Sequence, residues 1–103
     1  MEYITNAPEG RDLLNDRKPG WFRRINPEWF FIGDPHQCVL GQVYGSYERG
    51  KEVLFGNIDA YKEADRYGFA TWNLHEHGYS EETLQAEWMQ IITELQLGDS
   101  KEQ

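Results

Sequence analysis

The chain has 103 residues, a length typical of one domain with a single modest core. Hydrophobic residues make up 39% of it and aromatic residues 15%, which excludes a disordered chain. The first 33 residues carry as many basic as acidic side chains, so the net charge of -8 falls entirely on residues 34–103. A surface of that sign repels a phosphate backbone, and we therefore expect no direct binding of nucleic acid.

Further features bear on location and domain organisation. No apolar run approaches the roughly 20 residues that span a bilayer, and the first residues lack the basic-then-apolar pattern of a secretory signal. Cys38 is the only cysteine, so no intramolecular disulfide is possible. We expect a cytoplasmic protein that does not bind membranes. Residues 1–103 should form one domain, with residues 1–5 and 99–103 as flexible ends.

The N-terminal third predicts short elements separated by proline and glycine. Asn6 is suited to cap a helix that runs through Leu14 and ends before Pro19 and Gly20. The Trp-Phe segment, residues 21–25, is expected to form one turn or a short extended piece. The following aromatic run, residues 29–32, fits a short strand or a buried linker. Without a clear second strand, we favour the linker.

Residues 34–50 are predicted to form the central helix. Asp34 is suited to accept hydrogen bonds from the first free N–H groups, and Gln37 completes a reciprocal capping box. Glycine costs a helix about 1 kcal/mol relative to alanine, so Gly41 and Gly45, one turn apart, predict a face that another backbone approaches closely. The apolar residues of this segment recur at helical spacing: Val39, Leu40, Val43, Tyr44 and Tyr47.

Shorter elements are predicted in the next thirty residues. A further helical turn is expected at residues 51–55. Asn57 is expected to cap a helix that ends near Arg66, and Gly68 then supplies the left-handed residue that follows it. The connection 69–79 has mixed polarity and no period, so it is predicted as a loop with a short extended piece at its start.

The best-defined helix is 80–97, which begins with a serine cap and is ended by Gly98. Glu81 and Glu82 occupy its first turn, where the helix dipole favours negative charge. Glu87 and Glu94 fall together on one flank, outside the apolar stripe. That stripe consists of Leu84, Trp88, Ile91, Ile92 and Leu95.

These elements predict an all-α domain of four to five short helices with aromatic-rich connections. One short pair of β-strands is the alternative for those connections. The 34–50 helix is expected to pack between the 80–97 helix and the Trp-Phe segment. The structural roles are assigned to Asp34, Cys38, Gly41, Gly45 and Trp88.

Cys38 is the first candidate for chemistry. It lies two residues after His36 near a predicted helix N-terminus, and both features lower a thiol pKa. However, residues two apart on a helix do not face each other, and nothing marks a third orienting residue. We therefore favour a buried structural cysteine over a nucleophile or a redox centre.

A zinc site and a nucleic-acid site are the other candidates. His36 and Cys38, with His75 and His77, offer four zinc-capable side chains, but their spacing differs from that of zinc knuckles. Residues 17–24 combine four bases with two aromatic rings, a small footprint against the overall charge. We expect no metal, no cofactor and no nucleic-acid ligand.

Several motifs of the chain resemble one family. The segment Cys38-Val-Leu-Gly-Gln-Val-Tyr-Gly45, with residues 18–21, residues 67–69 and Trp88, resembles a group of small uncharacterised proteins encoded by actinobacteriophages and related actinobacterial genomes. The resemblance covers most of residues 12–92. Some similar members carry a further cysteine just before Cys38, where this chain has none. The resemblance implies an accessory gene product of a phage or mobile element, present in the host cytoplasm. It supplies no assigned activity and no catalytic residue that could be carried over to this chain.

The leading functional hypothesis is a non-enzymatic acidic protein that binds a host protein and competes with nucleic acid for its basic surface. Glu81, Glu82, Glu87 and Glu94 are the predicted contact residues. One alternative is a small thiol enzyme or redox sensor centred on Cys38. Another is a metal-supported binding module. The sequence favours no particular oligomeric state.

Overall fold

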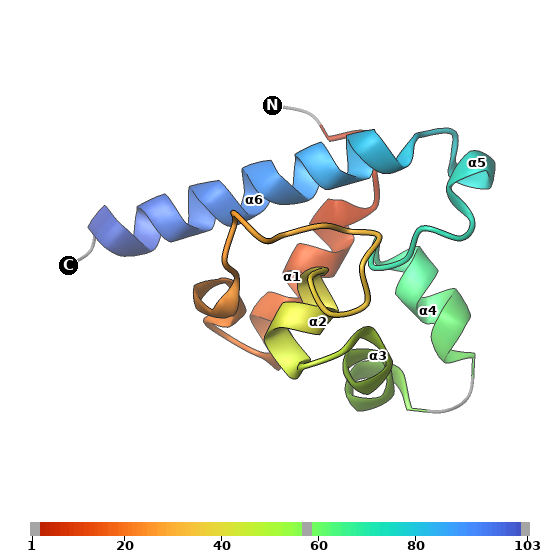
Figure 1. Cartoon of the computed structure of the whole chain (residues 1–103), viewed down its shortest axis with the longest axis horizontal. Helices are drawn as coiled ribbons and strands as arrows, with labels where there is room; N and C mark the ends of the chain where they lie inside the picture. Colours follow the sequence, from red (N-terminus) through yellow and green to blue (C-terminus); the bar gives the residue numbers. More distant parts are fainter. Residues whose placement is uncertain (1–2, 57–58, 102–103) are drawn as a thin grey trace.

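The computed structural model describes residues 3–56 and 59–101. These ranges contain helices joined by turns and loops, and no strand (Figure 1). The prediction of an all-α fold is confirmed, and a pair of β-strands is absent from the described residues. The single turn α5 is the helix that the sequence did not predict. In chain order the elements are α1 (Ala7–Arg17), the 3-10 helix η1 (Trp21–Arg24), α2 (Val39–Tyr44), α3 (Tyr47–Phe55), α4 (Ala60–Arg66), α5 (Leu74–His77) and α6 (Glu81–Lys101).

The helices form two groups around one core. The long helix α6 packs against α1, while α2 packs against α3 and α3 against α4 (Figure 1). The short helix η1 contacts both α6 and α2. The Trp-Phe segment therefore lies between the two groups. The prediction that residues 34–50 occupy this central position is wrong. No helix among the described residues is long and apolar enough to cross a membrane.

Aromatic rings fill the centre of the core. The Trp88 ring lies edge-on to Trp21, with 5.9 Å between ring centroids, and stacks on Phe69 at 5.6 Å. Both indole N–H groups are satisfied, since Trp88 donates to the Gly68 carbonyl at 2.7 Å and Trp21 donates to Asn15 Oδ1 at 2.9 Å. Trp88 therefore combines a large buried apolar area with a satisfied polar atom.

The predicted continuous helix 34–50 is wrong. Asp34 Oδ1 accepts the backbone N–H groups of His36 at 2.7 Å and Gln37 at 3.0 Å, so it closes a turn ahead of the helix. Cys38 is the N-cap of α2, and its Sγ accepts the Gly41 N–H at 3.3 Å. Aspartate side chains that bond to nearby backbone groups compete with helix formation in this way.

Gly41 and Gly45 have different structural roles, and neither lies at the closest contact between α2 and α3. A Cβ on Gly41 would lie 2.5 Å from the His36 carbonyl carbon, so the close approach exists, and the neighbour is the turn before α2. Gly45 has nothing within 4 Å of an added Cβ; its φ of +100° ends α2 in the left-handed region. The close contact between α2 and α3 falls instead at Gly50, where a Cβ would lie 2.8 Å from the Leu40 Cβ.

Helix starts elsewhere follow the sequence more closely. Ser80 caps α6, because its Oγ accepts the Thr83 N–H at 3.2 Å. At α1 the Asn6 side chain makes no capping bond, and Thr5 Oγ1 accepts the Ala7 N–H at 3.1 Å in its place. The predicted cap Asn57 lies outside the described residues.

Near both ends of the described chain, residues 4, 5 and 99 form hydrogen bonds with distant residues, while residues 1–2 and 102–103 of the predicted flexible ends lie outside the described residues. The backbone of residues 4 and 5 bonds to Glu87 on α6. The helix α6 continues past Gly98 to Lys101. On it, Asp99 Oδ1 pairs with Arg23 Nη2 at 2.6 Å, which also lowers the pKa of the Asp99 carboxyl.

Candidate functional site

Glu87 has an internal role in place of the predicted partner contact. Its carboxylate accepts the backbone N–H groups of Ile4 at 2.9 Å and Thr5 at 3.0 Å, together with the Thr5 hydroxyl at 2.6 Å. The side chain thereby fastens the N-terminal segment onto α6. A carboxylate that accepts three hydrogen bonds has few acceptor sites left for a partner. Glu87 is therefore not one of the contact residues in the function proposed below.

The other three glutamates of the predicted acidic face remain exposed. Glu81 and Glu82 lie in the first turn of α6, and Glu94 lies further along the helix, where it accepts the Gln90 amide at 3.2 Å. The Glu81 carboxylate occupies the space that a Cβ on Gly33 would need. It therefore lies directly against the loop that precedes α2.

Cys38 is a buried cap. Its side chain is 2% exposed, and burial raises the pKa of the thiol more than the N–H of Gly41 lowers it. The neighbouring His36 turns its ring toward the Gly45 carbonyl, with 3.3 Å between Nδ1 and the oxygen. Reactive cysteines are partly exposed and have a lowered pKa, whereas this thiol is buried and its pKa is raised.

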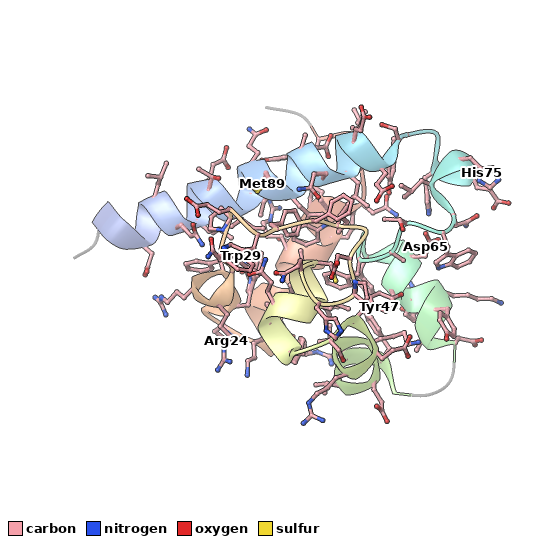
Figure 2. The ribbon with its side chains drawn as sticks, viewed as in Figure 1. Arg24, Trp29, Tyr47, Asp65, His75 and Met89 are labelled. Carbon is pink, nitrogen blue, oxygen red and sulfur yellow. The ribbon has the colours of Figure 1, made fainter. Side chains whose placement is uncertain are left out.

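The histidines considered as zinc ligands lie apart. His77 Nε2 lies 2.9 Å from Asp65 Oδ2, and its ring stacks on Tyr79. Figure 2 shows His75 on α5, away from Asp65 on α4. Among the described residues, no three histidine, cysteine or acidic side chains are placed to share a metal ion. The Asp65–His77 contact therefore ties α5 to α4.

An open groove of about 190 Å³ lies between the loop before α2 and the segment after α4. We call it the aromatic groove. It is lined by residues 32–35, by residues 69–72, and by the side chains of Cys38, Tyr47 and Tyr61. Tyr47 begins α3 and is labelled in Figure 2 between α2 and α4. Burial raises its pKa to about 12, so this ring is neutral at physiological pH.

Exposed rings stand around the aromatic groove. Tyr61 is 58% exposed and Trp72 is 55% exposed, although both line it. Phe31, 53% exposed, places its Cζ 3.5 Å from the position of a Cβ on Gly33. The floor, in contrast, belongs to the core, because Ile32, Cys38 and Phe69 are buried. The groove is thus an apolar surface continuous with the core and open to solvent.

The position of the loop wall is fixed by a side chain that the sequence analysis missed. Gln85 on α6 donates to the Phe30 carbonyl at 2.9 Å and accepts the Ile32 N–H at 2.7 Å. This pairing buries Phe30 and Ile32 and turns Phe31 outward. Gln85 directly follows the buried Leu84, at the edge of the predicted apolar stripe. A polar side chain at the edge of that stripe is the sequence feature that could have indicated this role.

The charged side chains in the lining and at the edge of the aromatic groove are acidic. Of the described residues, Asp34 is the only charged one in its lining, and Glu81 lies at Gly33 on its edge. Lys51 lines a neighbouring cavity; its ammonium lies 3.5 Å from the Tyr61 ring centroid and 2.9 Å from Glu48 Oε2. The lysine charge is therefore balanced by Glu48, and the groove itself is negative.

Comparisons of the chain with family models, curated proteins and solved structures find no match. The chemistry of the aromatic groove is therefore the guide to function.

Proposed function

We propose that this protein is a non-enzymatic binding protein that uses the aromatic groove to dock onto another protein. The observation that carries the proposal is the ring of half-exposed aromatic side chains, Phe31, Tyr61 and Trp72, around an apolar floor. Exposed apolar patches on small proteins mark interaction sites, and tryptophan and tyrosine dominate the binding energy of protein interfaces.

The partner is a protein with a basic surface. The negative edge of the groove and the exposed Glu81, Glu82 and Glu94 support this choice, because complementary charge steers association. The resemblance to actinobacteriophage proteins supports a host protein as that partner, and a basic host surface is one that nucleic acid also seeks. In this proposal, the protein competes with nucleic acid for the surface.

The burial of Cys38 favours the binding role over a thiol enzyme or a redox sensor. A nucleophilic cysteine needs a partly exposed, electropositive setting, whereas this thiol is almost inaccessible and its pKa is raised. Likewise, the engagement of His77 with Asp65 favours binding without metal support.

Capture from a host lysate tests the proposal. The immobilised protein is compared with Trp72→Ser, which removes one exposed ring of the groove, and with Leu97→Ser as the matched control. Leu97 on α6 is 57% exposed, similar to Trp72 at 55%, but does not line the groove. We expect Trp72→Ser to lose a bound protein that the wild type and Leu97→Ser retain, with unchanged circular dichroism for all three. Equal capture by all three would overturn the groove as the contact surface.

A further inference from the structure

One wall of the aromatic groove carries backbone groups that bond to none of the described residues. Residues 69–71 lie outside any helix or turn. Within the described part of the chain, the N–H and C=O groups of Ala70 and the N–H of Thr71 form no hydrogen bond, whereas the Thr71 C=O begins the turn at residues 72–73. Ala70 is nevertheless buried. Buried backbone groups in folded proteins are almost always paired, so these groups are suited to bond with an incoming chain.

The size of the aromatic groove limits what it can hold. Sites for cofactors and drug-sized ligands usually occupy about 300–1,000 Å³. At about 190 Å³, with Ile32, Cys38 and Phe69 on its floor, the groove suits one apolar side chain. An anchor residue that fills such a pocket is the usual centre of a protein interface.

Charge selects the neighbours of that anchor. Asp34 is held in a fixed orientation, since its Oδ1 accepts two backbone N–H groups of the turn. Its side chain is still partly exposed, and Glu81 lies on the same edge. No lysine or arginine lines the groove in the described residues. A cationic side chain is therefore favoured beside the anchor, and an anionic one is disfavoured.

We infer that the aromatic groove binds an extended segment of a partner protein, with one apolar side chain in the groove and a lysine or arginine at Asp34 and Glu81. The backbone of the segment pairs with residues 70–71. Alternate side chains of an extended chain point to the same face, so the basic residue lies two positions from the apolar anchor. This inference rests on the proposed function and gives the partner its chemistry.

Selection from a library of short random peptides displayed on yeast tests the pattern directly. The wild-type protein should enrich peptides in which leucine, isoleucine or another large apolar residue stands two positions from lysine or arginine. Trp72→Ser should enrich none of them, while Leu97→Ser should enrich the same set. Enrichment of acidic neighbours, of no positional pattern, or of no peptide at all would overturn the inference.

Two measurements on an enriched peptide separate the contributions. Asn retains the oxygen that accepts the turn N–H groups, so Asp34→Asn removes charge without removing the turn. We expect it to weaken peptide binding about tenfold, whereas Asp16→Asn, at an exposed position of α1 that does not line the groove, should leave affinity unchanged. N-methylation of the peptide at the anchor residue should also weaken binding if the backbone pairs with residues 70–71. Unchanged affinity for Asp34→Asn and for the methylated peptide contradicts the proposed mode.

The two proposals fail differently. Loss of lysate capture in Trp72→Ser, combined with no peptide enrichment, would keep the groove as a docking surface for a folded partner and reject the extended segment. Peptide enrichment that is the same for the wild type and Trp72→Ser would reject the groove itself.

Discussion

The four tryptophans divide into two pairs that occupy contrasting regions. Trp21 and Trp88 are at most 1% exposed and donate their indole N–H groups to Asn15 and Gly68. Trp29 is 61% exposed and Trp72 is 55% exposed, and neither indole N–H has a hydrogen-bond partner among the described residues. Burial in the core explains the presence of the first pair. The second pair adds nothing comparable to the core, so its apolar area is available for a partner.

The largest test of this contrast replaces one tryptophan from each pair. Trp88→Ala should lower the free energy of unfolding by about 3–5 kcal/mol, since it leaves a cavity between Trp21 and Phe69. Trp72→Ala should change it by less than about 0.5 kcal/mol. Urea denaturation followed by far-ultraviolet circular dichroism measures both. A comparable loss in the two variants would mean that the groove rings belong to the core.

The same contrast applies to carboxylates on α6. Glu87→Gln weakens three charge-assisted hydrogen bonds to residues 4 and 5, so we expect it to lower the free energy of unfolding by about 1.5–3 kcal/mol. Glu82→Gln, at an exposed position of the first turn, should cost at most about 0.5 kcal/mol. If Glu87→Gln is as stable as Glu82→Gln, the N-terminal segment is not fastened by this side chain.

The smallest expected effect concerns the floor of the groove. Cys38→Ala removes the N-cap of α2 and should lower the free energy of unfolding by about 1 kcal/mol. In the wild type, iodoacetamide should label Cys38 far more slowly than a free thiol. Because burial raises its pKa, the stability tied to the protonated thiol is present below the ordinary pKa and is lost as pH rises through the folded value. Fast labelling near neutral pH would revive the thiol alternative.

Local signals were enough to predict α6. Ser80, the acidic first turn and the apolar stripe all act within a few residues of each other, and the helix begins at Glu81 as that pattern predicts. The predicted end of α6 at Gly98 is too early, since the helix continues to Lys101. On this last turn Asp99 pairs with Arg23, a contact between distant residues that local sequence signals do not reveal.

The segment 34–50 shows why an apolar period alone does not define a helix. Two residue types that cap helices, Asp34 and Ser46, lie within it, and each bonds to backbone N–H groups. The left-handed Gly45 then divides α2 from α3. A period of three and four residues persists across the break because both helices bury their apolar residues in the same core.

The aromatic groove could not be predicted from the sequence. Its walls come from residues 32–35 and 69–72, which no periodicity connects. The outward position of Phe31 depends on Gln85, more than fifty residues away along the chain. Glu87 is a related case, because helical geometry placed it correctly outside the apolar stripe and gave no sign of the N-terminal segment that covers it.

The attachment of residues 4 and 5 to Glu87 also sets an order of events during synthesis. The bonded groups are 82 and 83 positions apart, so residues 4 and 5 leave the ribosome well before the helix α6 to which they bond. Contacts of such long separation form late, because most of the chain must be ordered before they repay the loop-closure entropy. Residues 4 and 5 should therefore become fixed only after α6 has formed, and a protease should be able to cleave near them until then.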